Sequence, residues 1–269
     1  MLVVTVATVV MVAACSLGDA ESSTAPSAPP SGQTPTESAG TSPDPTAGSA
    51  VDAEGIEHAG NSYLVVTLPL EQWDVSVEWD PEDRGTMLRD AVAEDPTIAV
   101  ATNGGIFTPE LVPGGLLVAD GVEMVPLNLS EGAGNFHLMP NAVFAVYEDG
   151  HAAVVNSVDY NGEGVMQATQ SGPALILDGD VHPAFNEGSS NLAVRSGVGV
   201  SPEGDTVYLA ISWSFTNLWD FATLFRDELG VEDALYLDGD ISTLWIESMD
   251  EPGPVAGPYA GIITARERS

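Results

Sequence analysis

The chain has 269 residues and is strongly acidic, with 40 Asp and Glu against 6 basic residues, all arginine, and a formal net charge of -34. Such a charge repels polyanions, so nucleic acid and anionic lipid surfaces are excluded as partners of the surface as a whole, and most carboxylates are expected to serve solubility. The single cysteine excludes an intrachain disulfide, so the folded part must depend on its own hydrophobic core.

The first 60 residues predict export rather than a folded core. Residues 1–14 form an apolar run that ends in small residues, which is typical of a signal peptide. Cys15 follows at once, as in a bacterial lipobox, where the cysteine is lipidated; the alternative is an ordinary signal peptide with a coincidental cysteine. Residues 15–60 are rich in Ser, Thr and Pro and predict a disordered tether. We therefore expect an extracytoplasmic bacterial protein, anchored to the cell membrane only through Cys15, with one folded domain over residues 61–269.

The folded domain is expected to consist mostly of strands. Apolar or alternating runs between turn residues predict strands or hairpins at 63–68, 75–79, 97–102, 114–127, 132–139, 142–147, 151–155, 167–177, 194–201, 206–212, 235–237, 243–246 and 260–265. Helices are predicted at 84–93 and at 217–229, the second with Thr216 as its cap and Gly230 at its end. Strands dominate without βα alternation, so the predicted fold class is α+β, with a large mixed sheet or two packed sheets.

Two buried strand runs end in a polar residue followed by glycine. One continues as Asn103-Gly104-Gly105-Ile106-Phe107 and the other as Asp238-Gly239-Asp240. Loops after buried strands are rigidly held yet exposed, which suits a functional site. The alternative is a simple turn, because Asn-Gly and Asp-Gly are favoured turn dipeptides. These residues alone leave both interpretations open.

Familiar catalytic motifs are absent. The sequence contains no GxSxG, no HExxH, no phosphate-binding GxxxxGK and no dinucleotide fingerprint. Its histidines lack metal-ligand spacing and are His58, His137, His151 and His182. A structural role is favoured for each, and a place in a pocket stays open for His137 and His182.

The polar and glycine-rich segments nevertheless form an ordered set of motifs. They are Asn103-Gly104-Gly105-Ile106-Phe107, Pro113 with Gly115-Leu116, Leu127-Asn128, Gly134-Asn135-Phe136 with Pro140-Asn141, Gln170-Ser171-Gly172-Pro173, Arg195 with Gly197-Val198-Gly199, Thr216-Asn217 with Asp220-Phe221-Ala222, and Leu237-Asp238-Gly239 with Ser242. In these motifs residues 61–266 resemble the phosphodiester glycosidase domain family, most closely a bacterial branch associated with exopolysaccharide metabolism. The family usually reads Asp-Gly-Gly-x-Ser in the last motif, whereas this chain has Asp240 in place of the second glycine.

The resemblance implies a hydrolase of a glycosyl phosphodiester in envelope or exopolysaccharide metabolism. Cleavage at the anomeric carbon needs a carboxylate, for which Asp238 is the candidate, and the phosphate needs a cationic donor, for which Arg195 is the candidate. Asn103 is the third expected catalytic residue. The residues expected to bind a saccharide or sugar-phosphate substrate are Gly104, Gly105, Phe107, Ser171, Gly172, Asn217, Gly239, Asp240 and Ser242.

Two other functions stay open. A non-catalytic saccharide-binding lipoprotein of the cell surface would use aromatic platforms, for which Trp213, Trp219 and Trp245 are placed near the motifs. A cation-dependent enzyme would hold Ca²⁺ or Mg²⁺ between Asp238 and Asp240. No other cofactor is expected, and the residues do not determine the sugar, the polymer or the oligomeric state.

Overall fold

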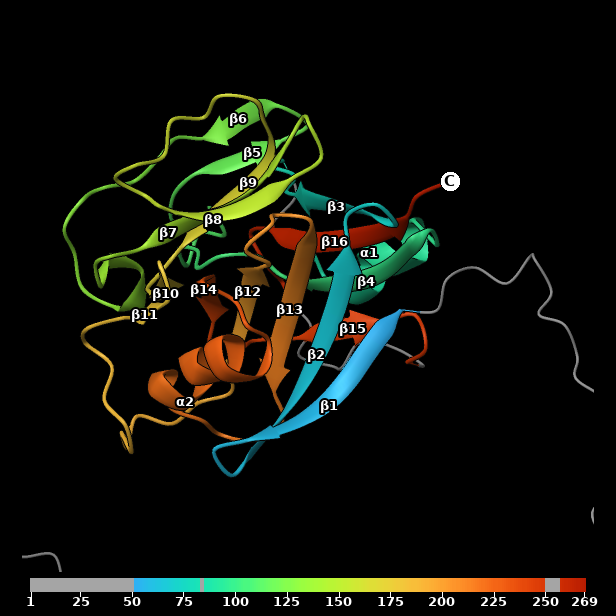
Figure 1. Ribbon diagram of the computed structural model, residues 1–269. Coiled ribbons are helices and arrows are strands. Elements are labelled where there is room, and N and C mark those ends of the chain that lie inside the picture. Colours follow the sequence, from blue (N-terminus) through green and yellow to red (C-terminus); the bar gives the residue numbers. More distant parts are fainter. Residues whose placement is uncertain (1–50, 83–84, 250–256) are drawn as a thin grey trace, which may run out of the picture. The chain divides into compact units, whose positions relative to one another are not determined.

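The computed structural model describes residues 51–82, 85–249 and 257–269; the predicted signal peptide, Cys15 and most of the predicted tether lie outside them. The described residues form sixteen strands in three sheets, with two short α-helices (Figure 1). This confirms the predicted α+β class and its dominance by sheet. The strand pairs are antiparallel rather than mixed, because short hairpins join many of the neighbours and parallel pairs would need long crossovers.

The largest sheet has seven strands and carries most of the segments that matter for function. In spatial order they are β1 (Asp52–His58), β2 (Asn61–Pro69), β13 (Thr206–Ser212), β12 (Ser196–Val200), β14 (Asp233–Asp238), β10 (Ala174–Leu177) and β11 (Asp180–Val181). Strand β14 lies inside this sheet, between β12 and β10, and its residues 234–237 are buried.

Strand β1 corrects the predicted start of the domain. It pairs along its whole length with β2, from Asp52 opposite Thr67 to His58 opposite Asn61, so the folded part begins before residue 61. The pattern of β1 alternates exposed and half-buried residues and contains no apolar run. An edge strand of this kind is held by backbone pairing to one neighbour, which residue type does not reveal.

The other two sheets are smaller. The four-stranded sheet is, in order, β15 (Leu244–Ile246), β4 (Ile98–Asn103), β16 (Ile262–Glu267) and β3 (Trp73–Glu78). The five-stranded sheet is β6 (Val122–Val125), β5 (Leu117–Ala119), β9 (Val165–Ser171), β7 (Ala142–Tyr147) and β8 (Ala152–Asn156).

One hydrophobic core is shared by the three sheets. Val66 of β2, Val77 of β3 and Phe144 of β7 all belong to it, and each is at most 1% exposed. Because side chains alternate across a strand, Val65 of β2 points to the opposite face and joins a second core. The seven-stranded sheet is therefore buried on both faces near its centre, which holds β12 and β14 firmly.

The second core lies between this sheet and helix α2 (Leu218–Thr223), which continues as the π-helical segment η2 (Leu224–Glu228). Phe221 and Phe225 are fully buried there beside Tyr236 of β14. The helix is thus packed against this sheet, nearest to β10 and β11. Its cap is Asn217 rather than the expected Thr216, since the Asn217 side chain accepts a hydrogen bond from the Asp220 N–H at 2.9 Å.

Two other expectations are corrected. Residues 132–139 form a loop with a short 3-10 turn, η1 (Asn135–His137), instead of a strand, because Gly134 has a φ of 89° that breaks the extended backbone. Helix α1 spans Leu88–Glu94 and so begins later than residue 84. Neither α1 nor α2, the α-helices of the described residues, is long and apolar enough to cross a membrane.

Candidate active site

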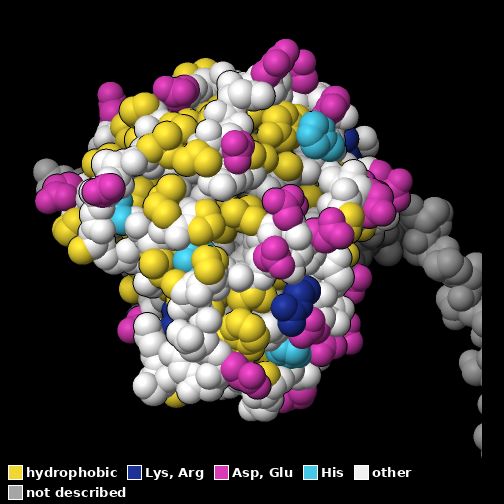
Figure 2. All heavy atoms as spheres, turned by 60° about the vertical axis from the view of Figure 1, so that its left-hand side comes forward, with side chains coloured by type: hydrophobic (Ala, Val, Ile, Leu, Met, Phe, Trp, Pro, Cys, Tyr) yellow, Lys and Arg dark blue, Asp and Glu magenta, His cyan; other side chains and the backbone are white. Residues whose placement is uncertain are grey.

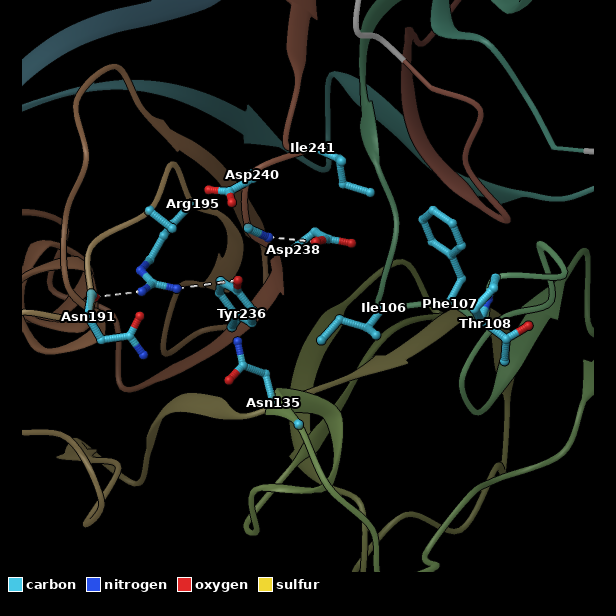
Figure 3. Close-up of a pocket in the computed structure, with 14 residues that line it drawn as sticks. Ile106, Phe107, Thr108, Asn135, Asn191, Arg195, Tyr236, Asp238, Asp240 and Ile241 are labelled. Carbon is cyan, nitrogen blue, oxygen red and sulfur yellow. Dashed lines mark hydrogen bonds between the residues drawn. The ribbon is translucent and has the colours of Figure 1, made fainter. Parts of the chain in front are cut away.

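A pocket of about 620 Å³ opens beside the carboxyl end of β14 (Figure 3). Four separate segments form it: the loop after β4, the start of η1, the approach to β12, and the end of β14 with the turn that follows. Its lining residues are Ile106, Phe107, Thr108, Pro109, Gly134, Asn135, Asn191, Ala193, Arg195, Tyr236, Asp238, Gly239, Asp240 and Ile241. The pocket therefore combines two carboxylates, one guanidinium and several neutral polar groups.

Asp238 is the carboxylate best placed for chemistry. It is the last residue of β14 and is half-buried, and the loss of solvent around it raises the pKa of its carboxyl group. The neighbouring negative charge of Asp240 raises this pKa further. The Gly239 N–H donates a 2.6 Å hydrogen bond to Asp238 Oδ1 and opposes the shift. Figure 3 shows the Asp238 side chain directed into the pocket.

Gly239 is required by the packing of the turn. A Cβ at this position would lie 2.9 Å from the Tyr236 hydroxyl, which is fixed on the preceding strand. Any larger residue would therefore push the turn away from Tyr236 and move the adjacent Asp238.

Tyr236 and Arg195 form a buried pair in the wall of the pocket. Arg195 Nη1 donates to the Tyr236 hydroxyl at 3.4 Å, and the guanidinium carbon lies 5.6 Å from the centre of the tyrosine ring. Burial raises the pKa of Tyr236 to about 12 although the Arg195 charge lowers it, so this hydroxyl is neutral and able to donate.

Arg195 differs from the other arginines of the described chain. Those at 89, 226, 266 and 268 form ion pairs with carboxylates, whereas Arg195 forms none. It is only 2% exposed and donates to the Thr216 and Asn191 carbonyls, both at 2.9 Å, as well as to Tyr236. Since a guanidinium has five N–H donors, one on each terminal nitrogen has no acceptor among the described residues. Arg195 is therefore a pre-oriented cation in the wall of the pocket.

Positive charge is rare elsewhere on the surface. Figure 2 shows acidic side chains spread singly over one face of the molecule, among apolar ones, with few Lys or Arg side chains between them. An anionic group of a ligand consequently has few places to bind, and the buried Arg195 in the pocket is the most specific of them.

Asn103, expected to be catalytic, lies behind the pocket rather than in its lining. It is 1% exposed, its Nδ2 donates to Ser196 Oγ at 2.9 Å, and its Oδ1 accepts from the Thr243 N–H at 3.1 Å. Ser242 Oγ donates to the Asp238 carbonyl at 2.9 Å and shares a second hydrogen bond with Ser196 Oγ, with the two hydroxyl oxygens 2.8 Å apart. This network fastens the turn after Asp238 to strands β4 and β12, so Asn103 and Ser242 hold the turn in place from outside the lining of the pocket.

The other expected binding residues outside the pocket also have structural tasks. Ser171 is fully buried and joins the Ile106 N–H (3.1 Å) to the Leu237 carbonyl (3.0 Å), thereby linking the loop after β4 to strand β14. Asn217 caps α2. Gly104, Gly105 and Gly172 allow close packing, because an added Cβ would lie within 2.9 Å of backbone oxygens. Of the expected site residues, only Phe107, Arg195, Asp238, Gly239 and Asp240 line the pocket.

Four polar residues of the pocket were not among the expected site residues: Thr108, Asn135, Asn191 and Tyr236. Tyr236 precedes Asp238 by two positions on one strand, so strand alternation places both on the same side and is a signal that the sequence carries. Asn135 lies inside the Gly134-Asn135-Phe136 motif. Asn191 belongs to a loop with no distinctive pattern.

A bound cation would find Asp238 and Asp240 as carboxylate ligands. No group of three or more His, Cys, Asp or Glu side chains suited to a metal occurs among the described residues. Ca²⁺ takes six to eight oxygen ligands, so most of them would have to be backbone carbonyls, water or substrate.

Comparison with known proteins agrees with the motifs. The family model for phosphodiester glycosidase matches residues 96–260, more than half of the chain. The Escherichia coli (strain K12) protein YigE, itself uncharacterized, is 36% identical over 150 residues, which make up 56% of this chain and 59% of YigE.

Two solved structures share the fold. The catalytic domain of zebrafish N-acetylglucosamine-1-phosphodiester alpha-N-acetylglucosaminidase, auto-inhibited by its pro-peptide, has a TM-score of 0.57 and 17% identity over 81% of this chain and 82% of that one. A hypothetical protein from Synechocystis has a TM-score of 0.55 and 15% identity over 80% of this chain and 61% of that one.

Proposed function

Because the chain belongs to the phosphodiester glycosidase family, we propose that it hydrolyses a glycosyl phosphodiester in the pocket around Asp238 and Arg195. One observation carries this proposal: the one described arginine without a carboxylate partner and the half-buried carboxylate of Asp238 line the same cavity. A sugar–phosphate ester needs both groups, a cation for the phosphate and a carboxylate for the sugar.

In the proposed reaction the bond between the anomeric carbon and a phosphate oxygen breaks, and its electron pair leaves with the phosphate. The oxygen of a water molecule forms the new bond to the anomeric carbon. The water proton passes to the Asp238 carboxylate and from there to the departing phosphate or to solvent. The products are a free sugar and a phosphate monoester.

The environment of Asp238 supports its role as proton acceptor. Burial and the nearby Asp240 raise the pKa of its carboxyl group, which makes the carboxylate a stronger base than an exposed aspartate. Its negative charge also opposes the positive charge that develops on the sugar ring in an oxocarbenium-like transition state.

Arg195 supports binding of the phosphate. Its position is held by three hydrogen bonds to the protein, so little side-chain entropy remains to be lost when a phosphate takes the two free N–H groups. A phosphate monoester is a good leaving group when its charge is neutralised, which reduces the need for a separate general acid.

We further propose that the protein acts outside the cytoplasm, anchored through lipidated Cys15, in envelope or exopolysaccharide metabolism. The apolar run, the cysteine directly after it and the Ser, Thr and Pro-rich segment support this placement. The zebrafish enzyme of the same fold bears a name that describes a glycosyl phosphodiester substrate, which supports the substrate class.

A non-catalytic saccharide-binding protein is the second candidate. Trp213 and Phe215 are 63% and 64% exposed, which is unusual for large aromatic residues and suits stacking against sugar rings. A cation-dependent enzyme with Asp238 and Asp240 as ligands is a variant of the first candidate.

A hydrolysis screen separates the three. The full-length protein is incubated with a panel of glycosyl phosphodiesters and with the corresponding alkyl glycosides, with and without EDTA. Turnover of a phosphodiester alone supports the proposed enzyme, and its loss with EDTA and recovery with Ca²⁺ or Mg²⁺ supports the cation-dependent variant. Saccharide binding without turnover favours the binding protein.

A further inference from the structure

The pocket contains more negative than positive charge. Its lining has two carboxylates, Asp238 and Asp240, and one guanidinium, Arg195, and the other lining residues are uncharged. The Tyr236 hydroxyl is among the uncharged groups, because burial raises its pKa to about 12. With both carboxylates ionised, two negative charges and one positive charge give the lining a net charge of -1. The proposed reaction uses Asp240 only through its effect on Asp238, so the second carboxylate needs a further explanation.

Asp240 is not committed to the structure of the turn. It is exposed, and among the described residues its carboxylate forms no ion pair and accepts no hydrogen bond. The turn is held by other groups: the Ser242 N–H donates to the Gly239 carbonyl at 2.8 Å, and Ser242 Oγ donates to the Asp238 carbonyl at 2.9 Å. The negative charge of Asp240 is therefore available to act on a ligand.

The charge of Asp240 acts inside the pocket. It raises the pKa of Asp238, and both carboxylates belong to the same lining as Arg195 (Figure 3). An anion bound at Arg195 consequently meets the repulsion of Asp240 as well. Since a Coulomb energy is proportional to the charge of the ligand, Asp240 opposes a dianion about twice as strongly as a monoanion.

This difference matters for phosphate esters. A phosphodiester carries one negative charge, whereas a phosphate monoester carries two above its second pKa of about 6. We propose that Asp240 is a charge filter, which weakens binding of phosphate dianions more than binding of monoanions. The filter favours a phosphate esterified on both sides over a free terminal phosphate. It also promotes release of the monoester product, a conclusion that rests on the proposed function for the identity of that product.

Two ligands of one shape and different charge test the filter without turnover. Methyl phosphate and methyl sulfate each have a methoxy group and three terminal oxygens, and at pH 8 the first is a dianion and the second a monoanion. NMR titration of the full-length protein at low, fixed ionic strength measures both dissociation constants, because salt screens an exposed charge. Asp240→Asn should tighten binding of methyl phosphate about tenfold and of methyl sulfate about threefold. The ratio of the methyl phosphate constant to the methyl sulfate constant should thus fall about threefold.

The chain offers a matched control for this substitution. Asp180 is the third residue of the other Asp-Gly-Asp tripeptide, and it is exposed and outside the pocket. Asp180→Asn should therefore keep the wild-type ratio, and so should Asp240→Glu, which retains the charge. All three variants are expected to fold, since both side chains are exposed.

Three results would overturn the proposal. One is an unchanged or higher ratio in Asp240→Asn. Another is weaker binding of both anions by this variant, as expected if Asp240 held a cation that bridges to the ligand. The third is no binding of either anion to the wild type.

Hydrolysis separates failure of the filter from failure of the proposed function. A glycosyl methyl phosphate would release methyl phosphate, so the same ligand serves as product inhibitor. Its inhibition constant should be about tenfold lower in Asp240→Asn than in the wild type. Turnover with an unchanged ratio of dissociation constants keeps the enzyme and overturns the filter. A lowered ratio without hydrolysis of any phosphodiester keeps the filter and overturns the enzyme.

Discussion

Arg195 and Tyr236 meet in two ways at once: a terminal guanidinium nitrogen donates to the tyrosine hydroxyl at 3.4 Å, and the guanidinium carbon lies 5.6 Å from the centre of the same ring. Tyr236 is fixed in a central strand, so it holds the Arg195 guanidinium at a defined position in the wall of the pocket. The pair links the expected anion site to the strand that carries Asp238 and places both groups in one rigid unit.

Replacement of Arg195 by lysine tests the anion site. Lysine keeps the charge but loses the planar fork, so Arg195→Lys should weaken binding of the substrate phosphate by about 1.5–3 kcal/mol. The Thr216 and Asn191 carbonyls also lose their donors, so a lower melting temperature is expected and binding must be measured well below it. The control is Arg226→Lys, whose guanidinium is paired with Asp227 outside the pocket. If both variants bind the substrate phosphate with equal affinity, Arg195 does not form the anion site.

Asp238→Asn separates chemistry from turn structure. Asparagine keeps the oxygen that accepts from the Gly239 N–H, so the fold should persist and the melting temperature should stay within a few degrees. Loss of the charge should lower kcat by about a thousandfold or more, about 4 kcal/mol of barrier, while substrate still binds.

The chain contains a matched control for this substitution. Asp178-Gly179-Asp180 repeats the same tripeptide in the hairpin between β10 and β11, outside the pocket. Asp178→Asn should therefore leave both kcat and melting temperature near the wild-type values. Wild-type turnover by Asp238→Asn would refute the catalytic assignment, and a large fall in melting temperature with a proportionate loss of activity would favour a turn residue.

The pH dependence of kcat/KM should show the electrostatic interaction between the carboxylates of Asp238 and Asp240. The pKa of Asp238 is raised above its ordinary value of 3.8, first by burial and then by Asp240. If the carboxylate is the active form, kcat/KM falls as the pH drops through this raised pKa. Asp240→Asn removes the like charge, lowers the pKa of Asp238 and should move the acid limb of the pH profile to lower pH. An unshifted limb would contradict the coupling, and Asp180→Asn serves as the control.

The free energy of unfolding should also depend on the ionisation of the Asp238 carboxyl group, and the raised pKa fixes the direction of this dependence. A carboxyl group whose pKa is raised by folding contributes stability that is complete below its unfolded pKa, near 3.8, and is lost as the pH rises through the folded value. The unfolding free energy of wild type relative to Asp238→Asn should therefore decline with rising pH over this window. Urea unfolding at several pH values measures the difference.

Asn103→Ala tests whether this residue positions the turn or contacts the substrate. The substitution leaves the Thr243 N–H and the Ser196 hydroxyl without their buried partner, so unfolding should become easier by about 1–3 kcal/mol. A positioning role predicts a lower kcat with little change in KM. The control is Asn161→Ala, in which an exposed turn loses only a hydrogen bond to the Glu163 N–H. A raised KM with an unchanged free energy of unfolding would indicate that Asn103 contacts the substrate.

Cys15→Ser tests the anchor in a bacterial host that processes lipoproteins. The variant should move from the membrane fraction to the medium or remain as unprocessed precursor, because no thiol is left to carry the lipid. Fractionation and immunoblotting measure the change. A processed variant that stays in the membrane fraction would end the lipoprotein proposal.

Residue type and spacing predict most of the strands and the class of the fold. Residues 98–101 of β4 and 234–237 of β14 are apolar, and a glycine follows the polar residue that ends each strand. The scarcity of positive charge favoured Arg195 as the anion site. The Asp-Gly-Asp turn occurs twice, so Asp238 was favoured over Asp178 by the ordered set of motifs that resembles the family. Strands and turns are local features, since each depends on residue type and on spacing within one segment.

Which polar residues face the pocket depends on tertiary packing. Asn103 and Asp238 both follow buried strands and precede glycine, yet one is enclosed by Ser196 and Thr243 while the other opens into the cavity. Asn135 and Asn191 reach the same pocket from distant loops. The direction of a side chain at the end of a strand depends on which other segments are packed over it, and that contact pattern joins residues far apart in the chain, where no local periodicity records it.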